Sequence, residues 1–215
     1  MSGTDTLLEE HAARPRISVL VSGRGSNLQS IIDAIRRGDL NATIAVVVSN
    51  KPDAYALTRA REAGIEGVFL NPKEYTGREA YDAAIVDVLK ARDVSLVCLA
   101  GFMRLISAPL LDAFPNRILN IHPSLLPAFP GLDGQRQALQ HGVRFAGCTV
   151  HLVTAGLDDG PIVLQAAVPV RDDDTEETLA ARILAEEHRL YPDAIQIVLD
   201  GGWRVDGRRF TRGRA

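Results

Sequence analysis

The sequence predicts an α/β protein with a doubly wound, mostly parallel sheet and helices on both faces, a Rossmann-like arrangement. Three observations predict it. Short apolar runs alternate along the chain with longer segments of helical period. The apolar runs show little polar alternation, as expected of strands covered on both faces. A glycine-rich turn joins the first apolar run to the first helical segment, as in folds that bind ligands at the sheet edge.

The bulk composition disfavours several classes of protein. The chain has 215 residues, of which 46% are hydrophobic and 24% charged, as is usual for a globular domain. Its net charge of −3 disfavours a nucleic-acid partner, because binding to the phosphate backbone needs a basic face. No apolar stretch approaches the roughly 18 residues that would suggest a membrane span. We therefore expect a cytoplasmic protein with neither nucleic acid nor membrane among its partners.

The cysteines and the N-terminal residues fit that expectation. Cys98 and Cys148 lie in apolar runs of unrelated predicted strands, so we expect packed, reduced thiols. No metal-ligand spacing surrounds them, and no metal is expected. Residues 1–15 are polar and lack the apolar core of a signal peptide, which predicts a disordered extension. Residues 16–215 are expected to form a single domain, because no linker or repeat divides them.

The first part of the chain alternates strand and helix. A β-rich run at 16–21 predicts the first strand, which Gly23 and Gly25 end. The next segment carries apolar residues at i, i+3, i+4 and i+7, namely Leu28, Ile31, Ile32 and Ile35. Ser26 and Gln29 match a capping box, which predicts the start of this helix. The segment at 42–49 is nearly all Val, Ile and Ala, as in a strand buried on both faces.

The same pattern continues to residue 122. A helix at 55–63 and a short strand at 67–70 follow. The helix at 78–91 is striped by Tyr81, Ile85, Val88 and Leu89. Strands at 95–99 and 118–122 flank a short helix at 108–113.

After residue 122 the pattern changes. Three prolines, Pro123, Pro127 and Pro130, predict a stiff, non-helical loop. A helix at 135–141 leads to strands at 147–153 and 162–170, joined by a loop rich in Gly and Asp. A long helix is expected from about Thr175, interrupted around Pro192 and ending at Gly201-Gly202.

The glycine loop at residues 22–27 reads Ser22-Gly23-Arg24-Gly25-Ser26-Asn27. Backbone N–H groups at a helix start, approached closely past glycines, form an anion site. A dinucleotide fingerprint does not fit, because Leu28 replaces the third glycine and Ser49-Asn50-Lys51 lacks the acid that would hold a ribose. A single phosphate is the better ligand, with Arg24 adding charge. The alternative is a tight turn whose glycines serve only geometry.

Asn120 and His122 stand two apart near the carboxyl end of a predicted strand, so both face one side of the sheet. This edge carries ligands in open parallel sheets. An amide donor beside an imidazole suits an oxyanion. The alternative is a polar pair that only ties down the proline loop, residues 123–130.

At these residues the sequence resembles the family of folate-dependent formyltransferases that use 10-formyltetrahydrofolate. Four motifs match that family in order and spacing: Ser22–Asn27, Ala100-Gly101-Phe102-Met103-Arg104, Asn120-Ile121-His122-Pro123-Ser124-Leu125-Leu126-Pro127, and Leu157-Asp158-Asp159-Gly160-Pro161. The resemblance runs from about residue 16 to residue 200. Within the family it is strongest to the enzymes that formylate glycinamide ribonucleotide in purine synthesis.

The resemblance implies roles for particular residues. Gly25, Ser26 and Asn27 would hold the substrate phosphate. Asn120 and His122 would stabilise the oxyanion, and Asp158 would sit against His122, favour its charged form and relay a proton through water. The 10-formyltetrahydrofolate co-substrate would lie on Met103, Arg104, Leu105 and Ile106, largely through backbone groups, and beside Asn120. Arg78 would meet the folate tail. The implied partners are these small molecules and, as a candidate assembly, a second copy in a homodimer.

Glu187 is singled out by helical period, since it shares a face with Leu179, Ile183 and Leu190. A buried carboxylate needs a partner. The resemblance makes that partner the ribose or amine of the substrate; a structural pair with an Arg is the alternative. The other histidines, among them His141, His151 and His188, are expected to be structural.

Two departures from the family pattern stand out. Asp133 occupies a position where relatives often carry His, and Asp159 adds an acid beside Asp158. Three other functions compete: hydrolysis of formyltetrahydrofolate, formyl transfer to another amine such as that of methionyl-tRNA, and nucleotide binding without catalysis. Hydrolases of formyltetrahydrofolate usually carry an N-terminal regulatory domain, and we disfavour this function because the first strand already begins at Arg16. Methionyl-tRNA formyltransferases carry an additional C-terminal RNA-binding domain, and we disfavour this function because only a short tail follows Gly202. The third leaves Asn120, His122 and Asp158 unexplained.

Overall fold

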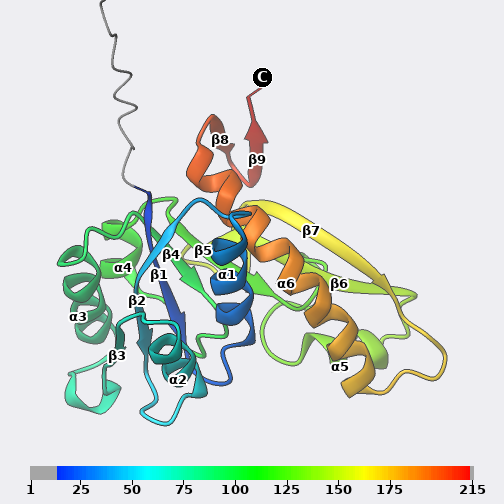
Figure 1. Cartoon of the computed structure of the whole chain (residues 1–215). Helices are drawn as coiled ribbons and strands as arrows, with labels where there is room; N and C mark the ends of the chain where they lie inside the picture. The colour runs from blue at the N-terminus through cyan, green and yellow to red at the C-terminus, as the bar shows by residue number, and fades with distance from the viewer. Residues whose placement is uncertain (1–13, 214–215) are drawn as a thin grey trace, which may run out of the picture.

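The computed structural model describes residues 14–213 as a seven-stranded sheet with helices on both faces and a separate two-stranded hairpin (Figure 1). The strands are β1 (Arg16–Val21), β2 (Thr43–Ser49), β3 (Gly67–Phe69), β4 (Leu96–Leu99), β5 (Ile118–His122), β6 (Phe145–Leu152), β7 (Ile162–Pro169), β8 (Trp203–Asp206) and β9 (Arg209–Arg212). The extension predicted at residues 1–15 lies, up to residue 13, outside the described residues.

The sheet has the order β3-β2-β1-β4-β5-β6-β7. The strands from β3 to β5 pair in parallel, whereas β5–β6 and β6–β7 are antiparallel. The predicted doubly wound, mostly parallel sheet is therefore confirmed. The chain moves outward from β1 through β2 to β3 and then returns to β4 on the other side of β1. This reversal places the switch point of the sheet between β1 and β4.

Helices cover both faces of the sheet because its central strands are apolar on both sides. The helices are α1 (Ser26–Arg37), α2 (Tyr55–Glu62), α3 (Arg78–Lys90), α4 (Ala108–Ala113), α5 (Gly134–Gln140) and α6 (Glu176–Asp200), with a 3₁₀ turn at Pro72–Glu74. On β1, Val19 belongs to the core beneath α1, α2 and α6, and Leu20 to the core beneath α3 and α4. Successive side chains thus enter opposite cores, as the pleat requires.

Two features of the C-terminal part differ from the sequence prediction. Helix α6 runs without interruption through Pro192, which is buried inside it. Tyr191, Ala194 and Ile195 are also buried, so packing on both sides of the proline outweighs the lost backbone hydrogen bond. Beyond Gly202, where the sequence predicted only a short tail, the chain forms the β8–β9 hairpin, in which Trp203 stacks on Phe210.

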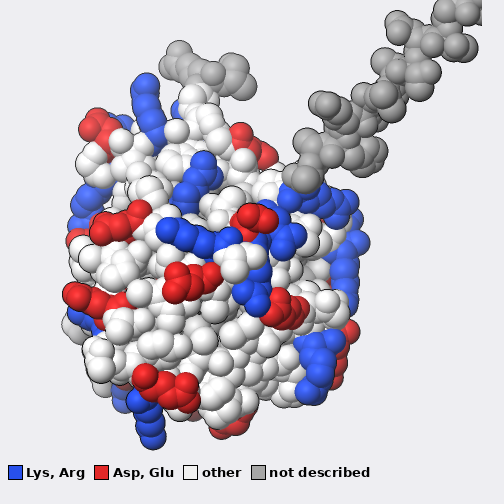
Figure 2. Space-filling view, turned by 90° about the vertical axis from the view of Figure 1, so that its left-hand side faces the viewer, with Lys and Arg blue, Asp and Glu red and all other residues white. Residues whose placement is uncertain are grey.

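The surface carries charges of both signs. On the face turned toward the viewer in Figure 2, Lys and Arg side chains are interspersed with Asp and Glu, with no broad field of one sign. Within residues 14–213, no helix has the length and apolar character to cross a membrane.

Candidate active site

Loops that follow β1, β4 and β5 meet at the carboxyl edge of the sheet. These strands are parallel neighbours, so the chain leaves all three at the same edge. The N–H of Met103 donates to Ser22 Oγ at 2.8 Å, which joins the loops after β4 and β1. The edge lies at the switch point, where open α/β sheets bind their ligands.

Gly25 starts helix α1 in the glycine loop. It is the N-cap residue, with a left-handed φ of 71°, and a Cβ placed on it would lie 2.6 Å from the Cβ of Ala56 on α2. Both the backbone conformation and this packing therefore require glycine. The predicted capping box of Ser26 and Gln29 is wrong, because no side chain caps this helix end and Gln29 donates to Asp33 instead. The first N–H groups of α1 are left without a side-chain cap, as suits an anion.

A cavity of about 330 Å³ adjoins the glycine loop. Polar side chains of α1 line it, together with Arg59 from α2 and His188 from α6. Arg59 is fixed there because its Nε donates to the carbonyl of Arg24 at 2.9 Å and its Nη1 to Gln29 Oε1 at 3.0 Å. His188 Nε2 is buried and has no hydrogen-bond partner within the described residues. Burial, together with the charge of Arg59, lowers the pKa of His188.

Sequence reasoning missed both of these residues. It did not single out Arg59, and it treated His188 as structural. Arg59 reaches the glycine loop only because α2 packs beside α1, and no local pattern reports that contact. His188 follows Glu187 on α6, and this adjacency is the one signal that could have drawn attention to it.

Glu187 faces inward, as its helical period predicted, and is 7% exposed. Its Oε2 accepts a hydrogen bond of 2.7 Å from Nδ2 of Asn27, at the start of α1. Its partner is thus an amide in the glycine loop, not the Arg of the structural alternative. Burial raises the pKa of Glu187, and the bond from Asn27 opposes that rise in part. The carboxyl group of Glu187 and the amide of Asn27 therefore lie side by side at the glycine loop.

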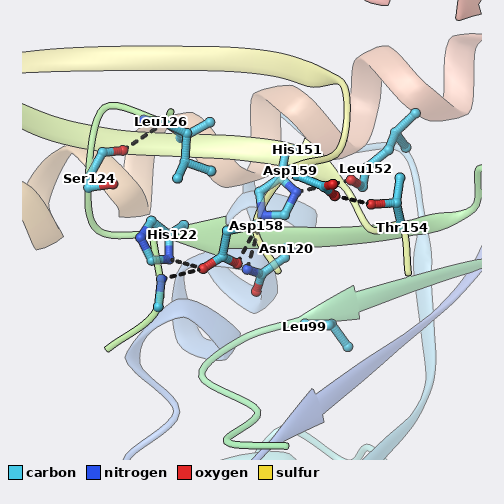
Figure 3. A network of polar contacts seen from close by, with 12 residues as sticks. Leu99, Asn120, His122, Ser124, Leu126, His151, Leu152, Thr154, Asp158 and Asp159 are labelled. Carbon is cyan, nitrogen blue, oxygen red and sulfur yellow. Dashed lines mark hydrogen bonds and ion pairs between the residues drawn. The ribbon is translucent and has the colours of Figure 1, made fainter. Parts of the chain in front are cut away.

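Asp158 lies against His122, as the resemblance implied (Figure 3). Its Oδ2 is 3.4 Å from His122 Nδ1 and accepts the N–H of Gly131 at 2.8 Å. Asp158 itself holds a left-handed φ of 49°, which is uncommon for a residue other than glycine. Asp159 turns away and accepts a short hydrogen bond from Thr154 Oγ1, so the acid beside the imidazole is Asp158.

His151 also belongs to this cluster, contrary to the sequence expectation. Its Nδ1 contacts the Leu152 carbonyl at 3.0 Å, which places the proton on Nδ1 and leaves Nε2 as an acceptor in the neutral ring. Nε2 lies 3.2 Å from Asn120 Nδ2 and 3.7 Å from Asp158 Oδ1. Residues 120 and 151 are direct cross-strand neighbours on β5 and β6. Only the register of that pair reveals the contact, so the sequence could not.

The pKa of Asp158 lies below its ordinary value. Burial alone favours the neutral acid and would raise it. The contact with His151, the N–H of Gly131 and the charge of His122 outweigh burial. A carboxylate is thus kept ionised between two imidazole rings.

His122 has acceptors on both ring nitrogens. Nδ1 faces Asp158, and Nε2 lies 2.9 Å from the carbonyl of Phe129 in the proline loop. Thr149 holds the same loop in place, accepting from the N–H of Leu126 at 3.0 Å and donating to the Ser124 carbonyl at 2.7 Å.

The segment at residues 101–107 follows β4 and exposes apolar side chains at the same edge. Met103 is 65% exposed and Leu105 is 59% exposed. Ile106 is half-buried, and the guanidinium of Arg104 lies 4.6 Å from the centre of the Tyr81 ring on α3. Large exposed apolar side chains beside a polar cluster are typical of a ligand surface.

Two further predicted positions lie at helix starts. Arg78 is exposed at the first residue of α3. Asp133, the departure from the family pattern, precedes α5 with a left-handed φ of 59° and forms an ion pair with Arg136. The Asp133 side chain does not cap α5, and its ion pair with Arg136 is exposed at the surface. Among residues 14–213, no cluster of three His, Cys, Asp or Glu side chains could hold a metal ion.

Comparisons with known proteins identify the family of this chain. A family model described as formyl transferase matches residues 15–195. The chain is 46% identical over 192 residues to the phosphoribosylglycinamide formyltransferase of Escherichia coli (strain K12), which covers 89% of this chain and 88% of that protein. A solved structure of glycinamide ribonucleotide transformylase 1 from Symbiobacterium toebii is 56% identical, with a TM-score of 0.94 over 99% of this chain and 100% of that one.

A third relative is much longer than this chain. The chain is 48% identical over 190 residues to the trifunctional purine biosynthetic protein adenosine-3 of Drosophila melanogaster, which covers 87% of this chain but 14% of that protein. The matched part of that relative is thus a small share of its length. The family match, the high identities and the shared fold lead to one conclusion: this chain belongs to the formyl transferase family.

Proposed function

We propose that this protein is a phosphoribosylglycinamide formyltransferase, which transfers the formyl group of 10-formyltetrahydrofolate to the amine of glycinamide ribonucleotide in de novo purine (IMP) biosynthesis. One observation carries the proposal. The glycine loop, the cluster of Asn120, His122 and Asp158, and the exposed 101–107 segment share one edge of the sheet. The relatives named above support it.

The proposed ribonucleotide lies along the start of α1. Its phosphate binds the N–H groups of Gly25, Ser26 and Asn27, where the helix dipole favours negative charge. Arg59 and His188 line the cavity beside them, and Arg59 adds a positive charge. Glu187, placed by its bond to Asn27, accepts hydrogen bonds from the ribose. These contacts direct the amine toward β5.

The proposed co-substrate lies on the 101–107 segment. Met103 and Leu105 cover the pterin, the backbone at 103–106 hydrogen-bonds to it, and Arg78 meets the folate tail. The exposure of these two apolar side chains supports this placement. The formyl group then reaches the cluster on β5.

The chemistry assigned to the cluster is stabilisation of the oxyanion. When the amine adds to the formyl carbon, the formyl oxygen becomes negatively charged. Asn120 Nδ2 and His122 donate hydrogen bonds to that oxygen. His151 turns the Asn120 amide, because its Nε2 accepts one N–H and leaves the other for the substrate. Asp158 stabilises the charged His122 ring and relays, through water, the proton lost by the attacking amine to the folate nitrogen. As the oxyanion collapses, the bond between the formyl carbon and that nitrogen breaks, and protonated tetrahydrofolate leaves.

His122 must exchange one acceptor to act in this way. Its Nε2–H is directed at the Phe129 carbonyl, and its Nδ1 at Asp158. Donation to the oxyanion therefore replaces the Phe129 carbonyl, while the bond to Asp158 persists. A small displacement of the proline loop on substrate binding accomplishes this.

A mixing experiment tests the proposal. Protein is incubated with 10-formyltetrahydrofolate, alone and with glycinamide ribonucleotide, and tetrahydrofolate and formylated product are followed. Formyl transfer that requires the ribonucleotide supports the proposal. Equal loss of the formyl group without it would identify a hydrolase, and transfer to methionine-charged tRNA instead would identify another amine. Binding without turnover would contradict catalysis altogether.

Location, domain organisation and assembly complete the proposal. A cytoplasmic location is supported by Cys98 and Cys148, which are buried and unpaired. One formyltransferase domain over residues 16–215 is supported by the single large sheet that collects all the site loops. The homodimer stays a prediction of the sequence, to be measured by analytical ultracentrifugation.

A further inference from the structure

A buried carboxylate on α3 holds the end of the 101–107 segment. Asp82 is fully buried, and its Oδ2 accepts hydrogen bonds from the Ser107 N–H at 2.7 Å and from the Ser107 Oγ at 2.5 Å. Ser107 precedes α4, and its hydroxyl does not cap that helix. The carboxylate of Asp82 therefore fixes the residue at which the segment turns into α4.

A buried hydroxyl just after β1 holds the beginning of the same segment. Ser22 is 5% exposed, and its Oγ accepts the N–H of Met103 at 2.8 Å. The same Oγ donates to Asn50 Oδ1 at 2.6 Å, so the hydroxyl cannot rotate without losing a bond. Ser22 is also the first residue of the glycine loop.

These two contacts fix the segment at its ends and leave its middle for a ligand. The N–H groups of Met103 and Ser107 have acceptors, whereas within residues 14–213 no hydrogen bond is found for those of Arg104 and Leu105. The proposed contacts to folate use the backbone here, and a backbone hydrogen bond weakens steeply when its angle or length is wrong. Small shifts of residues 103 and 107 would therefore weaken the hydrogen bonds between this backbone and the co-substrate.

We propose that Asp82 and Ser22 are positioning residues, which hold the backbone of residues 103–107 in the geometry that binds the folate co-substrate. Neither touches the co-substrate. The inference rests on the proposed function. Asp82 supports it further, because its Oδ1 is buried without a hydrogen-bond partner among the described residues. A buried carboxylate with one unpartnered oxygen costs stability, so stability alone does not account for an acid at this place.

Three substitutions test the inference, each removing part of the two contacts. Asp82→Asn keeps the shape and removes the charge, Ser107→Ala removes only the Oγ donor, and Ser22→Ala removes the acceptor of the Met103 N–H. Each is expected to raise the dissociation constant for tetrahydrofolate by about tenfold, a typical loss for a hydrogen bond to a charged or buried group. The dissociation constant for glycinamide ribonucleotide is expected to change by less than about twofold for Asp82→Asn and Ser107→Ala.

The chain offers matched controls. Asp87→Asn removes an acid from the exposed face of the same helix, and Ser95→Ala removes an exposed hydroxyl just before β4, away from the site. Both are expected to bind the two ligands as the wild type does. Thermal unfolding monitors the fold; should Asp82→Asn fail to fold, the two serine variants carry the test.

Isothermal calorimetry separates the outcomes. Selective loss of tetrahydrofolate affinity, with Asp82→Asn and Ser107→Ala less than additive in the double variant, supports the positioning role. Unchanged affinities, or equal loss for both ligands, would overturn it and leave the proposed function intact. A wild-type protein that binds no tetrahydrofolate would overturn both.

Discussion

At the scale of single residues, His122 has the most defined chemical task. In the proposed mechanism it donates to an oxygen that carries negative charge only near the transition state, so its removal should lower kcat and spare ground-state binding. We expect His122→Ala to lower kcat by roughly 10²–10³, as for the loss of one oxyanion donor. Single-turnover mixing measures the chemical step, and calorimetry measures binding of each substrate.

His141 supplies the control for that change. It is an exposed imidazole at the end of α5, where Nδ1 lies 2.9 Å from the Gln137 carbonyl, and His141→Ala should leave kcat unchanged. A His122→Ala protein with near-normal turnover would contradict the role of the ring in the chemical step.

Glu187 is expected to lower the stability of the folded protein above its pKa and to contribute to substrate binding. Burial raises its pKa, so the folded protein binds this proton more tightly than the unfolded chain does. Glu187 therefore contributes most to the free energy of unfolding at a pH below its pKa in the unfolded chain. This contribution is lost as the pH rises through its pKa in the folded protein. Glu187→Gln removes this dependence and keeps an acceptor for Asn27. We expect its Tm to exceed that of the wild type at about pH 8 and to match it at about pH 4.

The same substitution should weaken ribonucleotide binding, because in the proposed binding mode the ribose loses a charged acceptor. Glu186→Gln is the control: Glu186 is the preceding residue on α6 and pairs with Arg189 at the surface. A Glu187→Gln protein less stable than the wild type at about pH 8 would mean that burial does not disfavour the ionised form of Glu187.

At the scale of elements, the loop at residues 154–161 positions Asp158 through a single glycine contact. A Cβ on Gly160 would lie 1.7 Å from the Leu152 carbonyl oxygen of β6, so Gly160→Ala must displace the loop backbone. A Cβ on Gly156 meets only the end of the Asp159 side chain, which can move. We expect Gly160→Ala to lower both Tm and kcat, and Gly156→Ala to leave both nearly unchanged. Comparable losses in the two variants would show that the loop as a whole, and not the β6 contact, places Asp158.

Local sequence signals were sufficient for most elements but not for their pairing. Glycines and prolines mark the ends of strands and helices, so the helix at 108–113 and the strands at 16–21 and 118–122 were predicted with the bounds observed. The β8–β9 hairpin was missed, although Asp206-Gly207 is a turn signal between two short β-rich runs. The continuity of α6 through Pro192 depends on tertiary packing, which local rules do not include.

Some residues of the candidate site could likewise be predicted from local sequence, and others depend on tertiary contacts. Residues adjacent in sequence to a motif, such as Asn120, His122 and Asp158, could be named from spacing and resemblance. His151 could not, because its place beside Asn120 depends on the antiparallel register of β5 and β6. Arg59 likewise depends on how α2 packs against the glycine loop.

At the scale of the whole molecule, the proposed substrates bind at one edge of the sheet and leave the opposite edge free of ligand. The loops at 22–27, 101–107 and 123–131 follow the carboxyl ends of β1, β4 and β5, and the loop at 154–160 reaches the same site through Asp158. The turns at 38–42 and 92–95 lie where β2 and β4 begin. A ligand that binds only the folded state adds RT ln(1 + [L]/Kd) to stability, about 2.7 kcal/mol at 100 times Kd. That gain protects first the segments that the ligand itself orders.

Hydrogen exchange should therefore show protection at one edge only. With saturating glycinamide ribonucleotide and tetrahydrofolate together, we expect slower exchange in the loops at 22–27, 101–107, 123–131 and 154–160. Ribonucleotide alone should protect 22–27, and tetrahydrofolate alone 101–107. The β8–β9 hairpin, which packs through Trp203 on the end of α6 away from these loops, should exchange as in the free protein. Protection spread evenly over both edges, or confined to the hairpin, would place the substrates somewhere other than the switch point of the sheet.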